Sequence, residues 1–159
     1  MSAGASAPGG VELHVHLAAL LRARKLPELV ACWTRAADGQ RTPAAARSAA
    51  IALAEMRQLD EAQRVIDHWL ADATDVATRI LCARVAFDLG HYRVAIDRLE
   101  PLVTSPAARP SWWIIYLRSA LGCGDPERAL RLHAAYAALA EQDTAVGRAH
   151  AELLAVAGR

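Results

Sequence analysis

Apolar residues recur with a helical period along most of the chain, and helix start and stop signals separate the apolar segments. Thr42 and Asp125 are each followed by proline, which is typical of a helix start, and Gly90 is typical of a helix end. Pro101 predicts a kink or an end near Glu100. No strand-like alternation is present, so the pattern predicts an all-α chain. The expected helices cover residues 11–24, 27–37, 43–57, 61–71, 76–89, 92–103, 112–122, 126–140 and 144–157.

Three alanines recur at a nearly constant spacing. Ala62, Ala95 and Ala129 are 33 and 34 residues apart, and each follows a turn-like stretch and leads into a hydrophobic segment. Self-similarity at a period near 34 is typical of stacked helix pairs. The sequence therefore predicts four antiparallel pairs and one last helix, which covers the apolar end of the stack. Alanine suits the points where two helices cross closely.

The segment from residue 76 resembles the tetratricopeptide repeat (TPR) family. Ala83, Gly90, Tyr92, Ala95 and Leu99 stand at the small, glycine, aromatic, alanine and bulky apolar positions of that repeat. The resemblance implies antiparallel helix pairs stacked as a TPR-like solenoid with a C-terminal capping helix. We expect a single repeat domain over residues 11–159, after a disordered lead at residues 1–10.

Other segments depart from the family pattern. Arg57 replaces the glycine in the segment from residue 43, and His133 replaces the bulky apolar residue in the segment from residue 110. In the first pair, Leu29 stands where alanine is expected, and Trp33 takes the bulky position. The first pair is therefore expected to pack differently from the others.

One subgroup of the family is similar over a longer stretch. Residues 61–70 and 90–95, with tryptophans at Trp112 and Trp113, resemble the TPR-like chaperones of type III secretion needle subunits. Those compact chaperones usually lack the N-terminal helix pair expected here. The resemblance implies a chaperone that keeps an aggregation-prone needle subunit monomeric.

The TPR resemblance also implies a partner-binding groove. In the family, the groove is lined by set positions on the first helix of each pair. Carried over, they give an apolar stripe edged by arginines: Leu21, Arg47, Ile51, Ile80, Arg84, Phe87, Ile114, Arg118 and Leu121. Arg84 and Arg118 share one repeat position, so they are expected to project side by side and to bind a carboxylate. The alternative that the apolar residues are core and the arginines are merely solvated stays open.

Charge and hydropathy exclude several classes of function. The chain has 18 basic and 17 acidic residues, a balance that argues against a nucleic-acid footprint. No apolar run reaches the roughly 18 residues of a membrane-spanning helix. The N-terminus lacks the basic start and apolar centre of a signal peptide, so we expect a cytoplasmic protein.

No residue pattern predicts catalysis, a cofactor or a metal. His14 and His16 point to different faces of a helix, and no third ligand is evident. The three cysteines are widely spaced and form no CxxC pair. No phosphate-binding glycine loop or nucleophile arrangement is present.

The sequence thus favours a non-enzymatic adaptor or chaperone, which binds a helical or extended segment of a partner protein in its concave groove. The alternative is a self-assembling TPR scaffold, in which Trp112 and the groove form a homodimer. A helical enzyme or small-molecule-binding domain would require a buried polar cluster, and the sequence shows none.

Overall fold

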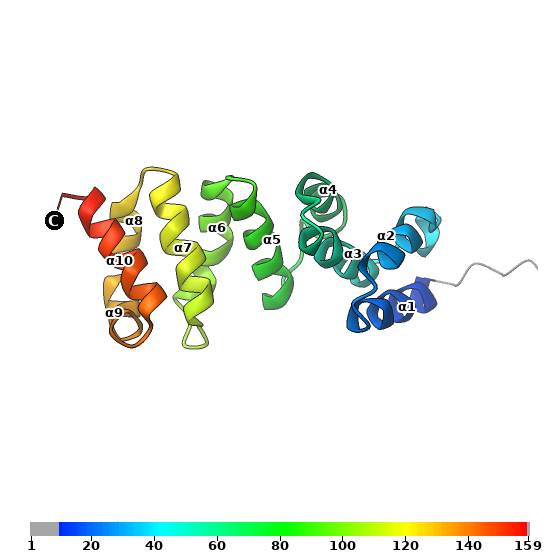
Figure 1. Ribbon diagram of the computed structural model, residues 1–159, viewed down its shortest axis with the longest axis horizontal. Coiled ribbons are helices and arrows are strands. Elements are labelled where there is room, and N and C mark those ends of the chain that lie inside the picture. The colour runs from blue at the N-terminus through cyan, green and yellow to red at the C-terminus, as the bar shows by residue number, and fades with distance from the viewer. Residues whose placement is uncertain (1–9, 159) are drawn as a thin grey trace, which may run out of the picture. The chain divides into compact units, whose positions relative to one another are not determined.

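The computed structural model describes residues 10–158, and these residues are helical without any strand (Figure 1). The helices are α1 (Gly10–Arg22), α2 (Leu26–Arg35), η1 (Asp38–Gln40), α3 (Pro43–Glu55), α4 (Leu59–Trp69), α5 (Val76–Asp88), α6 (Tyr92–Val103), α7 (Pro110–Gly122), α8 (Pro126–Leu130), α9 (His133–Gln142) and α10 (Thr144–Val156). The all-α prediction is confirmed. Of the predicted disordered lead, residues 1–9 lie outside the described residues, and Gly10 is the first residue of α1.

The chain divides into two compact units after Ala73. The N-terminal unit contains α1 to α4 and η1, and the C-terminal unit contains α5 to α10. The proposed single repeat domain over residues 11–159 stays a prediction.

In the N-terminal unit, α3 packs against α1, α2 and α4. Most of the buried residues of α3 are alanines, which bring the neighbouring helices close. Trp33 on α2 meets Trp69 on α4 edge to face, with ring centroids 6.0 Å apart. The Arg41 guanidinium lies over the Trp33 ring at 5.0 Å and donates hydrogen bonds to the carbonyls of Trp33 and Thr34, so it holds the end of α2.

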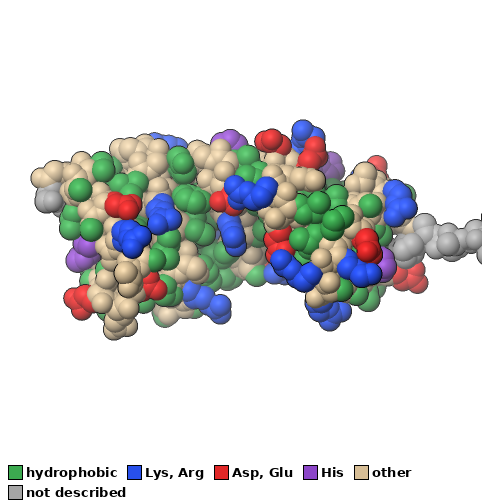
Figure 2. Space-filling model, viewed as in Figure 1, with side chains coloured by type: hydrophobic (Ala, Val, Ile, Leu, Met, Phe, Trp, Pro, Cys, Tyr) green, Lys and Arg blue, Asp and Glu red, His purple; other side chains and the backbone are tan. Residues whose placement is uncertain are grey.

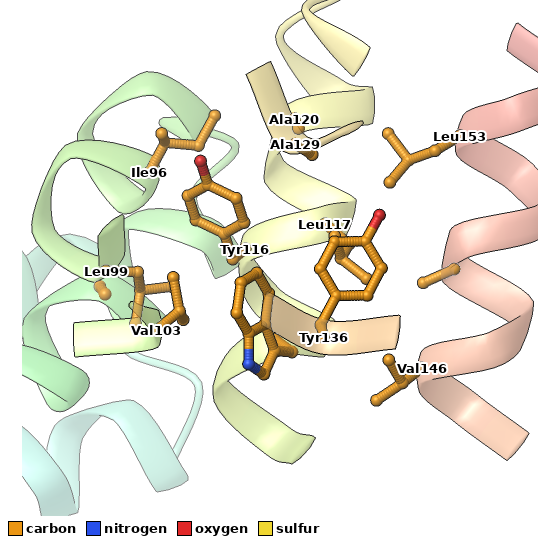
Figure 3. Packing of buried hydrophobic residues seen from close by; sticks show 13 residues of the cluster. Ile96, Leu99, Val103, Tyr116, Leu117, Ala120, Ala129, Tyr136, Val146 and Leu153 are labelled. Atoms are coloured by element: carbon orange, nitrogen blue, oxygen red, sulfur yellow. The ribbon is translucent and has the colours of Figure 1, made fainter. Parts of the chain in front are cut away.

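In the C-terminal unit, α5 pairs with α6, α6 packs on α7, and α10 packs against α7, α8 and α9. The core is aromatic: Trp113 lies 4.8 Å from Tyr136 and 5.7 Å from Tyr116 between ring centroids. Figure 3 shows Tyr116 on the side of Ile96, and Tyr136 on the side of Val146 and Leu153 of α10. The last helix thus covers this core, as a capping helix does.

The three regularly spaced alanines lie where the sequence predicts, at points where two helices cross closely. Ala62, Ala95 and Ala129 are fully buried, each near the start of the second helix of a pair. Their small side chains leave room for the close approach of the first helix.

A second regular feature follows the first helix of each pair. Four residues, 33, 33 and 34 positions apart, have left-handed φ angles: Arg24 (60°), Arg57 (62°), Gly90 (78°) and Gly124 (71°). In each turn this residue donates its N–H to the carbonyl three residues back, and the next residue donates to the carbonyl five residues back. Sequence reasoning predicted a helix end at Gly90 but no such turn at Arg24 or Arg57, because it does not expect arginine in this conformation.

One predicted helix is wrong. The helix expected over residues 126–140 is two helices, α8 and α9. Between them, the N–H of Leu132 donates to the carbonyl of Ala129 and the N–H of Ala135 donates to the carbonyl of Leu132. These hydrogen bonds span three residues instead of four, so they tighten the chain and interrupt the α-helix. The expected range 92–103 is confirmed for α6, and Pro101 does not end this helix near Glu100.

Candidate functional site

Each unit carries an apolar hollow between the first helices of its pairs. The α1–α3 hollow has a volume of about 500 Å³ and is lined by His14, Val15, Ala18, Leu21, Arg22, Ala44, Arg47, Ser48 and Ile51. The α5–α7 hollow has a volume of about 370 Å³ and is lined by Ile80, Arg84, Phe87, Asp88, Ser111, Trp112, Ile114, Ile115 and Arg118. Figure 2 shows basic side chains standing among apolar ones on one face of the molecule.

Eight of the nine predicted groove residues line one of these hollows. Leu21, Arg47 and Ile51 line the α1–α3 hollow. The other five line the α5–α7 hollow: Ile80, Arg84, Phe87, Ile114 and Arg118. Leu121 lines neither of these two hollows, and instead packs against the core of the C-terminal unit. That these residues bind a partner stays a prediction.

Helical periodicity brings the lining residues together. On α5, Ile80, Arg84 and Phe87 follow one another at steps of four and three, so they share one face. On α7, Ile114 and Arg118 are four residues apart. Ile80 and Ile114 also touch the aromatic core, so the floor of this hollow is fixed by the packing beneath it.

Charge at the α5–α7 hollow is mainly positive. Arg84 and Arg118 are exposed, and neither forms an ion pair with any residue that the structure describes. Asp88 adds one acidic side chain to the lining. An anionic group that enters this hollow therefore meets two arginines and one carboxylate.

Aromatic residues of the α5–α7 hollow are partly buried. Trp113 is fully buried, whereas its neighbour Trp112 lines the hollow. The Arg109 guanidinium lies 6.0 Å from the Trp112 ring. The sequence stripe missed Trp112, Ile115 and Asp88. The adjacent tryptophans in the sequence could have indicated Trp112, and no sequence pattern indicates Ile115 or Asp88.

The α1–α3 hollow has a different polar character. Its lining holds His14, Arg22 and Arg47 and contains no acidic residue. The Nε atom of Arg47 and the Nδ1 atom of His14 are buried and have no hydrogen-bond partner in the described part of the chain. Ile51, four residues after Arg47, lies on the same face of α3 as the guanidinium.

A histidine pair lies on α9 and α10, outside both hollows. The rings of His133 and His150 are stacked 4.7 Å apart, and the Tyr136 hydroxyl is 3.1 Å from Nδ1 of His150. Burial raises the pKa of Tyr136 to about 12. Burial, and then the charge of His133, lowers the pKa of His150. Across residues 10–158, no three His, Cys, Asp or Glu side chains are grouped so as to hold a metal ion.

An ionic network joins α6 to α8. Arg128 binds Asp97 at 2.9 Å and also binds Glu100. Burial, and then the nearby Glu100 carboxylate, raises the pKa of Tyr116 above its ordinary value. These contacts tie neighbouring helices together and lie outside the hollows.

Comparisons with known proteins support the fold. No protein-family model matches the sequence, and no curated protein matches it. A solved structure titled "MamA MSR-1 C2" is similar with a TM-score of 0.78 and 14% sequence identity, over 94% of this chain and 87% of that chain.

These comparisons give no support to the resemblance to needle-subunit chaperones. Among the described residues, no helix is long and apolar enough to cross a membrane. MamA is a TPR-like protein, and a likeness at this level of identity shows fold and no more. The chain has a TPR-like fold, built from helix pairs that repeat at intervals of 33 to 34 residues.

Proposed function

We propose that this chain is a non-enzymatic protein-interaction module that holds an amphipathic helix or an extended segment of a partner protein. The observation that carries the proposal is the α5–α7 hollow. Its floor of Ile80, Phe87 and Ile114 is apolar, and its edge carries Arg84 and Arg118, which have no ion-pair partner among the described residues. Apolar surface that is rimmed by polar groups is typical of interaction sites.

The lining specifies the chemistry of the partner. Burial of an apolar face against Ile80 and Ile114 supplies the main driving force. Trp112 is a suitable anchor, because tryptophan concentrates binding energy at protein interfaces. Acidic residues beside that apolar face would pair with Arg84 and Arg118, whereas Asp88 would repel an acidic residue placed next to it.

Such binding requires no turnover, so the module would act as an adaptor or a chaperone. It would shield the apolar face of its cargo until another protein displaces it. Type III secretion needle subunits as the cargo, and residence in the cytoplasm, stay predictions from the sequence.

The test is the recovery of partners on variants of the full chain. Ile80→Asp places a charge on the apolar floor, and Arg84→Glu reverses the charge at the edge. Val94→Asp and Arg93→Glu are matched controls, because both residues are exposed on α6 and neither lines a hollow. We expect both hollow variants to lose partners that the wild type and both controls retain. Equal recovery on all five proteins would contradict the proposal.

Self-assembly is the second candidate function, and two exposed valines favour it. Val11 and Val15 are 78% and 58% exposed and lie four residues apart on α1, so they form one apolar strip. Size-exclusion chromatography with light scattering distinguishes the two functions. A dimer that dissociates in Val11→Asp supports self-assembly, and a monomeric wild type at all concentrations contradicts it.

A further inference from the structure

Two histidines stack on each other where α9 and α10 pack together, outside both hollows. His133 is the first residue of α9, and His150 lies in the middle of α10. Their rings are almost parallel, with 16° between the ring planes and 4.7 Å between the centroids. His133 is exposed and His150 is half-buried, so the pair is open to ions in the solvent. The proposed function uses neither ring.

Tyr136 holds both imidazoles in place. Its side chain is fully buried and packs on Trp113. The Tyr136 ring contacts His133 and His150 edge to face, with centroids 5.3 Å and 5.5 Å away. A buried aromatic side chain that contacts both rings limits their freedom, so the two imidazoles are held together before any ligand binds.

The Tyr136 hydroxyl also bears on which nitrogen of His150 is available to a ligand. It lies 3.1 Å from Nδ1 of His150. When Nδ1 carries the proton, it donates to the hydroxyl oxygen, and the lone pair of the ring lies on Nε2. Metal-binding histidines are usually held in this way, through a partner of their second nitrogen. Neutral His133 likewise has a lone pair on one nitrogen, so the pair offers two imidazole ligands.

We propose that His133 and His150 together bind a late first-row divalent metal ion, such as Zn²⁺, through one nitrogen each. Imidazole nitrogen suits zinc, copper and nickel, whereas calcium and magnesium prefer oxygen ligands. Zn–N bonds are about 2.0–2.1 Å long, so two nitrogens on one ion lie at most about 4.2 Å apart. The rings are 4.7 Å apart, and a small rotation of the exposed His133 side chain closes the difference.

Water completes the coordination of the ion. Within residues 10–158, no third His, Cys, Asp or Glu side chain joins the pair, so the site differs from the closed four-ligand sites of structural zinc. The two ligands come from different helices, so the ion cross-links α9 to α10 and holds the capping helix over the aromatic core. Because the opening of α10 separates the ligands, metal binding stabilises the closed state. The inference goes beyond the proposed function and does not depend on it.

Nuclear magnetic resonance titration of the full chain with Zn²⁺, at constant pH, tests the inference. Zn²⁺ is the probe because it has no redox chemistry and therefore does not oxidise the free cysteines. We expect the imidazole signals of His133 and His150 to shift together and to saturate at one ion per chain. The exposed His68 and His91 should respond only at higher Zn²⁺ concentrations.

Variants assign the ligands. His133→Gln and His150→Gln should each weaken Zn²⁺ binding about tenfold or more, because each removes one of the two ligands. His68→Gln is the matched control, since it replaces another exposed histidine near the end of a helix, and it should bind Zn²⁺ as the wild type does. Tyr136→Phe keeps the ring but removes the hydroxyl partner of His150, so it should weaken binding about tenfold.

Hydrogen exchange separates metal binding from a structural loss. In the wild type, free Zn²⁺ at about 100 times its Kd should raise amide protection in α10 by up to about 100-fold over a sample with chelator. Protection of α3 in the N-terminal unit should not change. The samples with chelator show how far each variant, Tyr136→Phe included, loosens α10 without any metal.

Three outcomes would overturn the inference. They are equal Zn²⁺ affinity in the wild type and in a chain that carries both His133→Gln and His150→Gln, an equal loss of affinity in His68→Gln and His150→Gln, and unchanged protection of α10 with Zn²⁺. The wild-type titration and exchange need no variant, so a variant that fails to fold does not weaken the test. Zn²⁺ binding that fails while Ile80→Asp still loses partners would reject this site and leave the proposed function standing.

Discussion

The two units make the same turn after the first helix of each pair, but with different residues. In the N-terminal unit the left-handed position is Arg24 or Arg57, and in the C-terminal unit it is Gly90 or Gly124. The hydrogen bonds across all four turns have the same pattern. The packing of the helix pairs therefore imposes the turn, and glycine only relieves its strain. A non-glycine residue in this conformation costs about 1 kcal/mol or slightly more.

The units also differ in their aromatic anchors. Trp33 is buried in the N-terminal unit between Trp69 and the Arg41 guanidinium. Trp113 lies inside the C-terminal unit between two tyrosines. The three largest fully buried side chains, Trp113, Tyr116 and Tyr136, all lie in the C-terminal unit, whereas alanines make up most of the buried residues of α3 in the N-terminal unit.

The largest expected effect comes from removing these anchors. Trp113→Ala should destabilise the C-terminal unit by about 3–5 kcal/mol, the usual cost of deleting a buried large aromatic side chain. Trp33→Ala should cost less, because Trp33 is 6% exposed whereas Trp113 is fully buried. Urea unfolding gives the size of each loss, and hydrogen exchange locates it. Equal losses, or a loss of protection in the wrong unit, would contradict the distinction between the two anchors.

Overpacking a helix crossing should have the next largest effect. Ala95→Leu should cost about 1–3 kcal/mol, because the larger side chain forces α5 and α6 apart. Ala62→Leu should cost a similar amount at the crossing of α3 and α4. Thermal unfolding measures both changes. An unchanged melting temperature in either variant would show that the alanine does not mark a close crossing.

The turn itself predicts the same preference in both units, glycine over alanine at the left-handed position. Arg24→Gly should be about 1 kcal/mol more stable than Arg24→Ala, because both lose the exposed Arg24–Glu55 ion pair but only glycine relieves the strain. Gly90→Ala should destabilise the C-terminal unit by about 1 kcal/mol. Urea unfolding of the three variants tests the idea, which fails if Arg24→Ala is as stable as Arg24→Gly.

The smallest effect is a pH dependence confined to the C-terminal unit. The pKa of His150 is lowered by burial and then by His133, so the unfolded chain binds this proton more tightly than the folded one. The packing of α10 should therefore be most stable above about pH 6.5, the ordinary value for histidine, and lose stability as the pH falls below it. Hydrogen exchange of α10 should show this loss, and His150→Gln should reduce it. Greater protection of α10 from hydrogen exchange in acid than at neutral pH would contradict this prediction.

The sequence was sufficient for features that depend on local pattern. The helix starts, the alanine crossings and the face of α5 that carries Ile80 and Arg84 all follow from residue type and period. The break between α8 and α9 did not follow, because no proline or glycine marks it between residues 130 and 135. The left-handed Arg24 and Arg57 were missed because tertiary packing overrides local preference there.

The candidate site was predictable in part for the same reason. Repeat positions located Arg47 and Arg118, since their helices keep the repeat register. The missing partners of Arg47 and His14 depend on which side chains lie nearby in space, and no sequence pattern records that.

The central claim is that the α5–α7 hollow receives a partner segment. Site-specific photo-crosslinking tests it most directly, with a photoreactive residue at Ile114 in the hollow or at the exposed Val94 on α6. We predict that the probe at Ile114 forms a covalent adduct with a partner, that Arg84→Glu in the same chain abolishes the adduct, and that the probe at Val94 forms none. Equal adducts from both positions, or an adduct at Ile114 that persists with Arg84→Glu, would contradict the account.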